Sequence, residues 1–191
     1  MRTYRFKLAG ILLAAVVSLS IGKSLAEETA MPPMPQPTQQ HQWLQQFVGE
    51  WQSQNQMVMD PSQPPVESAG TEIVRPMGEF WTLTEVNATM MDMPFKGQMT
   101  LGYSAEKEKF VVTGVESMTG QLWEYEGNLN EAGNTLVLEA EGPCPMRGGK
   151  MTKFREELIL KDKDHKTYRS SIMDDEGNWV TMLTSEGTRQ K

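Results

Sequence analysis

The stretch HQWLQQFVGEW, residues 41–51, marks a change of hydrophobic period in the chain. Before Gly49, two apolar pairs are each spaced by four residues, which predicts a short amphipathic helix over residues 39–48 that Thr38 can cap. After Gly49, apolar residues tend to recur at every second position, as in half-buried strands. A helix of about ten residues is marginal alone, so we expect it to dock against the strands that follow.

Ten strand-like segments follow this helix, separated by short turns rich in Gly, Asn and Asp and by no further helical pattern. They cover residues 51–59, 66–75, 80–90, 95–103, 110–117, 121–129, 135–141, 150–161, 165–173 and 179–187. We expect a break at residues 76–78 and an irregular loop at residues 142–149. Short turns between strands predict antiparallel pairing, and closure would remove exposed edges. The sequence therefore predicts an all-β fold: a single antiparallel barrel or half-barrel of about ten strands with a short N-terminal helix.

The N-terminal region predicts export. Residues 1–26 combine a basic start, a 15-residue apolar run over 8–22 and small residues before position 27, as in a signal peptide. Residues 27–38 carry four prolines and read as a flexible tether, which leaves residues 39–191 for the barrel domain. We expect a periplasmic or secreted protein that is not held in a membrane after cleavage. An uncleaved N-terminal anchor helix is the alternative.

The composition is acidic and poor in cysteine. Removing residues 1–26 takes away four basic residues and no acid, so the net charge changes from −7 to −11. Such a charge argues against nucleic acid and anionic lipid surfaces as partners. Cys144 is the only cysteine, so no internal disulfide can form, and its role stays open. The oligomeric state stays open as well.

The glycine and tryptophan at Gly49-Glu50-Trp51 resemble the motif that opens the first strand of lipocalins and fatty-acid-binding proteins, the calycin superfamily. In that superfamily the tryptophan closes one barrel end and stacks against an arginine after the last strand. The resemblance thus implies a barrel-closing pair formed by Trp51 and Arg189. A wider resemblance, to the bacterial domain of unknown function 1579, is carried by residues 41–44, 49–51, 70–72, 99–103 and 122–127. That family implies a lipocalin-like fold and no reaction.

A barrel of this type predicts binding of a small apolar or amphipathic molecule in its interior. Strand arginines can hold a ligand carboxylate, and aromatic side chains can line a cavity. The candidate ligand-binding residues are Arg75, Trp81, Tyr103, Trp123, Tyr125 and Arg155. Each of them has an alternative place, in the solvent for the arginines and in the core for the aromatics.

Methionine suggests a second hypothesis, copper or soft-metal handling in the cell envelope. The chain has 15 methionines, and Met90, Met91 and Met93 are closely spaced. Thioethers are soft ligands that suit Cu(I), and Met57, Met59 or Cys144 could join them. Methionine is also a flexible filler of apolar cavities, and on that interpretation no cofactor is required.

Catalysis is the third hypothesis. The sequence holds no phosphate-binding loop, zinc-binding histidine pair or nucleophilic serine motif, so we expect binding rather than catalysis. A barrel-type enzyme would need an acid–base pair inside the cavity, such as Glu72 with Arg155. Only two histidines are present, and we expect both His41 and His165 to be solvated. A haem site would need one of them inside the barrel.

Overall fold

The computed structural model describes residues 34–191 except 61 and 91, and one compact unit spans Gln36–Lys191. The predicted signal peptide and residues 27–33 of the predicted tether lie outside the described residues. Within the described part of the chain, no helix has the length and apolar character needed to cross a membrane.

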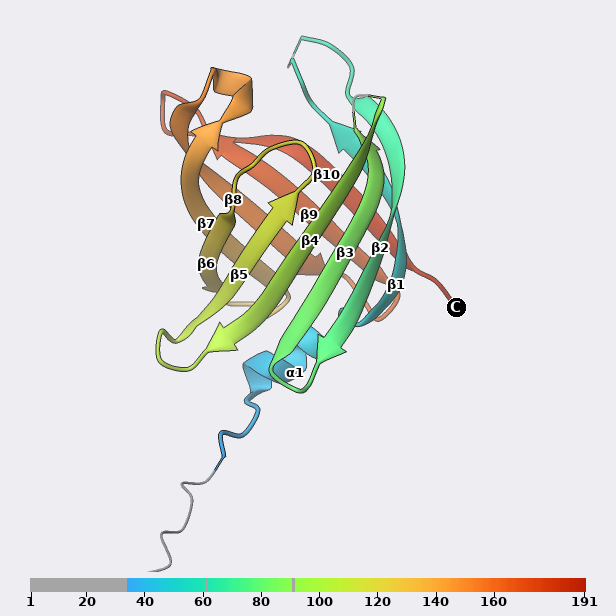
Figure 1. Ribbon diagram of the computed structural model, residues 1–191, viewed down its shortest axis with the longest axis vertical. Coiled ribbons are helices and arrows are strands. Elements are labelled where there is room, and N and C mark those ends of the chain that lie inside the picture. The colour runs from blue at the N-terminus through green and yellow to red at the C-terminus, as the bar shows by residue number, and fades with distance from the viewer. Residues whose placement is uncertain (1–33, 61, 91) are drawn as a thin grey trace, which may run out of the picture. The chain divides into compact units, whose positions relative to one another are not determined.

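Ten antiparallel strands form a closed barrel, which confirms the predicted fold class (Figure 1). The strands are β1 (Gly49–Met57), β2 (Val66–Met77), β3 (Trp81–Met90), β4 (Met93–Ser104), β5 (Lys109–Glu116), β6 (Trp123–Leu129), β7 (Thr135–Cys144), β8 (Lys150–Leu160), β9 (His165–Met173) and β10 (Trp179–Arg189). Each strand pairs with the next along the chain, and β10 pairs with β1. The register of this closing pair runs from Trp51 opposite Arg189 to Met57 opposite Leu183.

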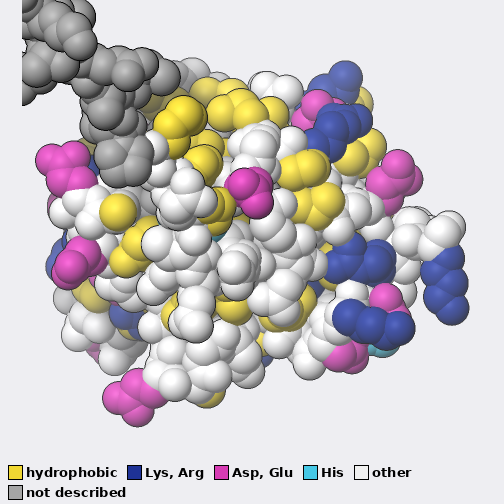
Figure 2. Space-filling model, turned by 90° about the horizontal axis from the view of Figure 1, so that it is seen from below, with side chains coloured by type: hydrophobic (Ala, Val, Ile, Leu, Met, Phe, Trp, Pro, Cys, Tyr) yellow, Lys and Arg dark blue, Asp and Glu magenta, His cyan; other side chains and the backbone are white. Residues whose placement is uncertain are grey.

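The α-helix of the described residues, α1 (Gln39–Gln45), lies at one end of the barrel, here called the helix end (Figure 1). It contacts β3 and β4. The predicted helix is three residues too long, because Gln46, Phe47 and Val48 donate backbone hydrogen bonds three residues back and tighten the last turn. Seen from the helix end, acidic and basic side chains are interspersed on the surface, which offers no continuous basic face to a polyanion (Figure 2).

The hydrophobic core occupies the half of the barrel next to the helix. Leu44 and Phe47 from the helix region meet Trp51, Phe110 and Leu136 from the strands, and all five are at most 3% exposed. Burial of this apolar stripe stabilises a helix that would be marginal alone. The half of the barrel away from the helix, here called the far end, is packed less completely.

Strands β2 and β7 continue into segments where a break or a loop was expected. The predicted break at residues 76–78 is wrong at its start, because β2 continues through Pro76, which lies opposite Thr82 of β3. Proline is tolerated there because β1 begins at Gly49, opposite Val74, so no residue of β1 lies opposite Pro76 and needs its missing N–H. The predicted loop at residues 142–149 is shorter than expected. β7 runs to Cys144, and a 3₁₀ turn at Pro145–Arg147 follows it.

Candidate functional site

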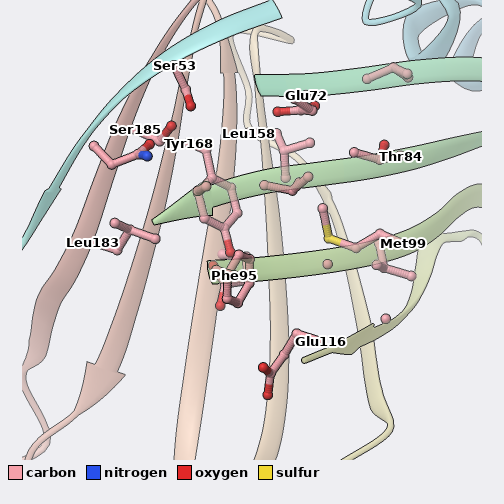
Figure 3. Close-up of a pocket in the computed structure, with 18 of the residues that line it drawn as sticks. Ser53, Glu72, Thr84, Phe95, Met99, Glu116, Leu158, Tyr168, Leu183 and Ser185 are labelled. Carbon is pink, nitrogen blue, oxygen red and sulfur yellow. The ribbon is translucent and has the colours of Figure 1, made fainter. Parts of the chain in front are cut away.

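A cavity of about 270 Å³ lies inside the barrel. Its apolar lining includes Val86, Phe95, Met99, Leu158 and Leu183, and the close-up shows several of these side chains around one space (Figure 3). The lining also includes strand ends that meet at the far end of the barrel: Met57, Val66, Met90 and Val115. The cavity therefore extends from the packed core toward the far end.

A buried carboxyl group lies in the wall of this cavity. Glu156 is 7% exposed, and its Oε1 accepts hydrogen bonds from the Ser170 hydroxyl at 2.9 Å and the Tyr125 hydroxyl at 3.3 Å. The Tyr168 hydroxyl also interacts with this carboxyl, and its ring projects into the cavity (Figure 3). Among the described residues, Oε2 of Glu156 has no hydrogen-bond partner. The carboxyl is thus held on one side by hydroxyl groups and left unpaired on the other.

The surroundings of Glu156 change its acidity. Burial raises the pKa of Glu156 to about 7, although the hydroxyls of Tyr168, Ser170 and Tyr125 lower it in part. Burial beside this carboxylate also raises the pKa of both tyrosines. Glu156 therefore titrates near neutral pH, whereas the tyrosines keep their protons.

A buried ion pair lies where the cavity meets the core. Lys166, 7% exposed, places Nζ 2.5 Å from Oε1 of Glu72, and both residues line the cavity. Burial lowers the pKa of Lys166, and the Glu72 carboxylate opposes this change. The ammonium also lies 4.5 Å from the centroid of the Trp51 ring. Lys166 is therefore already bound to an acid and an aromatic ring.

The residues predicted to close the barrel lie together at the helix end. The guanidinium carbon of Arg189 is 4.0 Å from the centroid of the Trp51 ring. Arg189 donates hydrogen bonds to the carbonyl oxygens of Gln46, Val48 and Lys163 at 2.5 to 2.7 Å. The indole N–H of Trp51 donates to the carbonyl of Phe47 at 2.8 Å. These contacts join the helix turn, the first strand and the last strand.

The six predicted ligand-binding residues do not share one site. Trp123 and Tyr125 line the cavity. Tyr103 points inward but packs on Phe110 in the core at the helix end, with ring centroids 5.2 Å apart. The other three, Arg75, Trp81 and Arg155, are absent from the lining.

Those three residues lie on the outer surface, because they alternate with inward-facing neighbours along their strands. Arg75 pairs with Glu85 at 3.0 Å, and Arg155 bonds to Glu139 and lies 4.1 Å from the Trp179 ring. Trp81 covers the outward face of Gly102. The suggested acid–base pair of Glu72 and Arg155 does not form, since Glu72 lies inside and binds Lys166 instead.

Of the charged residues that line the cavity, Glu72 was named as half of a possible acid–base pair, whereas Glu116, Glu156 and Lys166 were not predicted as part of a site. Glu156 lies between Phe154 and Leu158 in the alternating pattern of β8. Because every second side chain of a strand points to the same face, this pattern alone would have placed Glu156 on the apolar face. The same rule applies to Tyr168 and Lys166 of β9, but only the register shows which face of β9 is inward. Lys166 lies opposite Leu160 and Tyr168 opposite Leu158.

The predicted metal ligands are dispersed. Met57 and Met90 line the cavity, Met59 and Met93 are 42% and 49% exposed, and Cys144 is buried at the end of β7. Met91 lies outside the described residues. In the described part of the chain, no group of three or more His, Cys, Asp or Glu side chains is arranged to hold a metal.

The histidines also differ from expectation. The prediction that His41 is solvated is wrong, because this residue is only 4% exposed. Its Nδ1 accepts a hydrogen bond from the backbone N–H of Thr38 at 2.9 Å, and its ring packs on Phe80 and Tyr103. Tertiary packing over the first helical turn buries a residue that the helical pattern placed on the polar side. His165 is exposed and bonds to Asp162. Neither histidine belongs to the cavity lining.

Comparisons with known proteins agree with this architecture. The model of a family described as "Protein of unknown function (DUF1579)" matches residues 36–189. No curated protein matches the chain. Among solved structures, Rv2717c from M. tuberculosis is similar with a TM-score of 0.60 at 14% identity, over 82% of this chain and 100% of that one. The S-type phycobiliprotein lyase CPES from Guillardia theta is similar with a TM-score of 0.53 at 16% identity, over 78% and 92%. At these identities the likeness shows the barrel fold alone.

Proposed function

Because the chain belongs to the DUF1579 family of proteins of unknown function, we propose its function from the site itself: it binds a small apolar or amphipathic molecule inside the barrel. The observation that carries this proposal is the cavity of about 270 Å³, with mostly apolar walls and a buried polar group at Glu156. Ligand sites in proteins have this composition, in which apolar walls supply affinity and a few polar groups fix orientation.

The packing of the barrel supports binding over a purely structural role. Protein interiors are normally close-packed, and the helix end follows that rule with Trp51, Phe110 and Leu136 nearly inaccessible to solvent. The far half departs from it, because a cavity of about 270 Å³ remains between its walls. Small residues face the cavity at Gly97, Gly114 and Ala88, which keeps space open between the walls. The volume suits a ligand of modest size.

Binding can be tested with N-phenyl-1-naphthylamine, an uncharged probe that fluoresces in apolar surroundings. The purified protein should bind one equivalent with a rise in fluorescence. Ala88→Trp should abolish that rise, because residue 88 faces the cavity, whereas Asn87→Trp on the outer face of the same strand should leave it unchanged. Circular dichroism should show that both variants keep the β-sheet signal. Equal binding by both variants, or no binding by the wild type, would contradict the proposal.

We also propose that the protein acts outside the cytoplasm, after removal of residues 1–26. The basic start and the apolar run of residues 8–22 support this, and the family match begins only at residue 36, near the end of the predicted tether. The intact mass of the protein isolated from its own host tests the proposal. A chain beginning at Glu27 is expected, and a full-length chain retained with the membrane would instead support an uncleaved anchor.

A further inference from the structure

The charged groups of the cavity are unbalanced. The lining contains the carboxyls of Glu72, Glu116 and Glu156 and one basic side chain, Lys166. The ammonium of Lys166 is bound to Glu72, which leaves the other two carboxyls without a cation. Glu116, near the far end, accepts hydrogen bonds from the Met118 N–H and the Thr119 hydroxyl at 2.5 Å. Among the described residues, the lining therefore holds more acidic than basic side chains, and its one cation is already paired.

The hydroxyl groups around Glu156 have a fixed direction. When Glu156 is ionised it accepts hydrogen bonds, so the Tyr125, Tyr168 and Ser170 hydroxyls direct their protons toward it. A hydroxyl that has donated its proton still has lone pairs, and Tyr125 and Tyr168 both line the cavity. The wall around Glu156 thus presents hydrogen-bond acceptors, which donors on a ligand would pair with.

We infer that the cavity selects molecules with an apolar body and a primary amine head, and discriminates against anionic amphiphiles such as fatty acids. The inference rests on the proposed function and names the chemistry of its ligand. An ammonium group supplies three donors and a positive charge, and both suit acceptor oxygens beside a carboxylate. A carboxylate head beside Glu156 would lose its hydration next to a like charge, and the one basic side chain of the lining, Lys166, is already paired with Glu72.

The same geometry makes binding depend on pH. Glu156 is faced by Tyr125 on β6, by Tyr168 and Ser170 on β9 and by the uncharged Leu138 opposite it on β7. The tyrosines stay protonated near neutral pH, so Glu156 is the group whose charge changes there. Ionisation of Glu156 as the pH rises from 6 to 8 should strengthen binding of an ammonium, and a bound ammonium should in turn favour ionisation.

The experiment compares decylamine, decanol and decanoic acid, which share one chain and differ in the head group. Each is titrated at pH 8 against the protein loaded with N-phenyl-1-naphthylamine, and displacement gives the affinity. We expect decylamine to bind at least about tenfold more tightly than decanoic acid, with decanol between them. The affinity for decylamine should rise between pH 6 and pH 8, and that for decanol should not.

Two adjacent residues supply a matched pair of variants. Glu156→Gln should remove most of the preference for decylamine and its pH dependence. Glu157→Gln should change neither, because Glu157 lies on the outer face, 3.7 Å from Arg169. If Glu156→Gln fails to fold, Tyr168→Phe serves instead, since it removes one acceptor oxygen from the cavity wall. Ala88→Trp, which fills the cavity, should show no binding of decylamine in direct titration calorimetry, and binding retained there would point to the acidic surface instead.

The outcomes separate this inference from the proposed function. Equal affinity for the three head groups, or tightest binding of decanoic acid, overturns the inference and leaves a binding cavity. A preference for decylamine that Glu156→Gln and Tyr168→Phe both retain also overturns it. Failure of the naphthylamine probe itself to bind overturns the proposed function. The inference is supported if Glu156→Gln loses the preference for decylamine and Glu157→Gln keeps it.

Discussion

Replacing Glu156 by glutamine should change how the stability of the barrel depends on pH. In the unfolded chain this carboxyl ionises near its ordinary pKa of 4.5, whereas burial raises the pKa to about 7 in the folded protein. Between these two values the folded state binds more protons than the unfolded state, so the stability falls as the pH rises. Below pH 4.5 this loss is absent, and above about pH 7 it is complete.

The size of the effect follows from the same two pKa values. A difference of one pKa unit corresponds to about 1.4 kcal/mol, so the folded wild type should lose on the order of 3 kcal/mol of stability across this window. Glutamine resembles the protonated acid in shape and carries no charge. We therefore expect Glu156→Gln and the wild type to be similar in stability at pH 4.5, and the variant to be more stable by up to about 3 kcal/mol at pH 8.

Urea unfolding followed by tryptophan fluorescence at several pH values between 4.5 and 8.5 measures this difference. The free energy of unfolding of the wild type is subtracted from that of the variant at each pH. This removes the contribution of surface acids whose pKa values are lowered by neighbouring basic residues, because both proteins share it. Glu157→Gln is the control, and its difference should stay within about 0.5 kcal/mol at every pH because its ion pair is exposed. A difference for Glu156→Gln that is independent of pH would refute the reasoning.

Three further predictions, each with a control or rescue variant, test the fold. Gly127→Ala should cost about 3 kcal/mol or more in urea unfolding, because its Cβ would lie 1.8 Å from the backbone oxygen of Val137, whereas Gly120→Ala, with nothing within 4 Å, should cost little. Lys166→Met should lower the free energy of unfolding by about 3 to 5 kcal/mol, because it leaves Glu72 unpaired, and adding Glu72→Gln should recover most of this loss. Equal stability of the single and double variants would contradict a coupled pair. Arg189→Ala should lower the free energy of unfolding by about 2 kcal/mol, because the hydrogen bonds to three carbonyls are lost, and Arg189→Lys should lower it by less. Arg75→Ala, at an exposed arginine, is the control and should have almost no effect.

The sequence was sufficient to predict the barrel, because period-two alternation and short turns are local properties of the chain. Trp123 and Tyr125 were assigned to the interior for the same reason, and β6 places both at the cavity. Arg75 and Arg155 were placed with them on chemical grounds. Strand parity relative to Val74 and Phe154, both of which face inward, would have put these arginines outside.

The rest of the site depends on contacts between distant parts of the chain. Lys166 and Glu72 are 94 residues apart, and their pairing follows from barrel closure rather than from any local pattern. His41 is buried because Phe80, in the turn before β3, and Tyr103, in β4, pack on its ring from positions far along the chain. The Glu156 hydroxyl partners come from β6 and β9, which only the register brings together. The period of the hydrophobic pattern predicts which side chains of a strand face inward, but it does not predict which residues of other strands they contact.

The pairing of β1 with β10 has a consequence for the order in which the protein can form. Arg189 reaches back to the carbonyl of Val48, 141 residues earlier, so the first strand keeps an unpaired edge until β10 is available. A growing chain at the ribosome therefore lacks its closing strand until residues 179–189 have been made. If the chain is exported in unfolded form, as proposed above, this delay would be favourable, because the barrel could close only after β10 has followed β1 across the membrane.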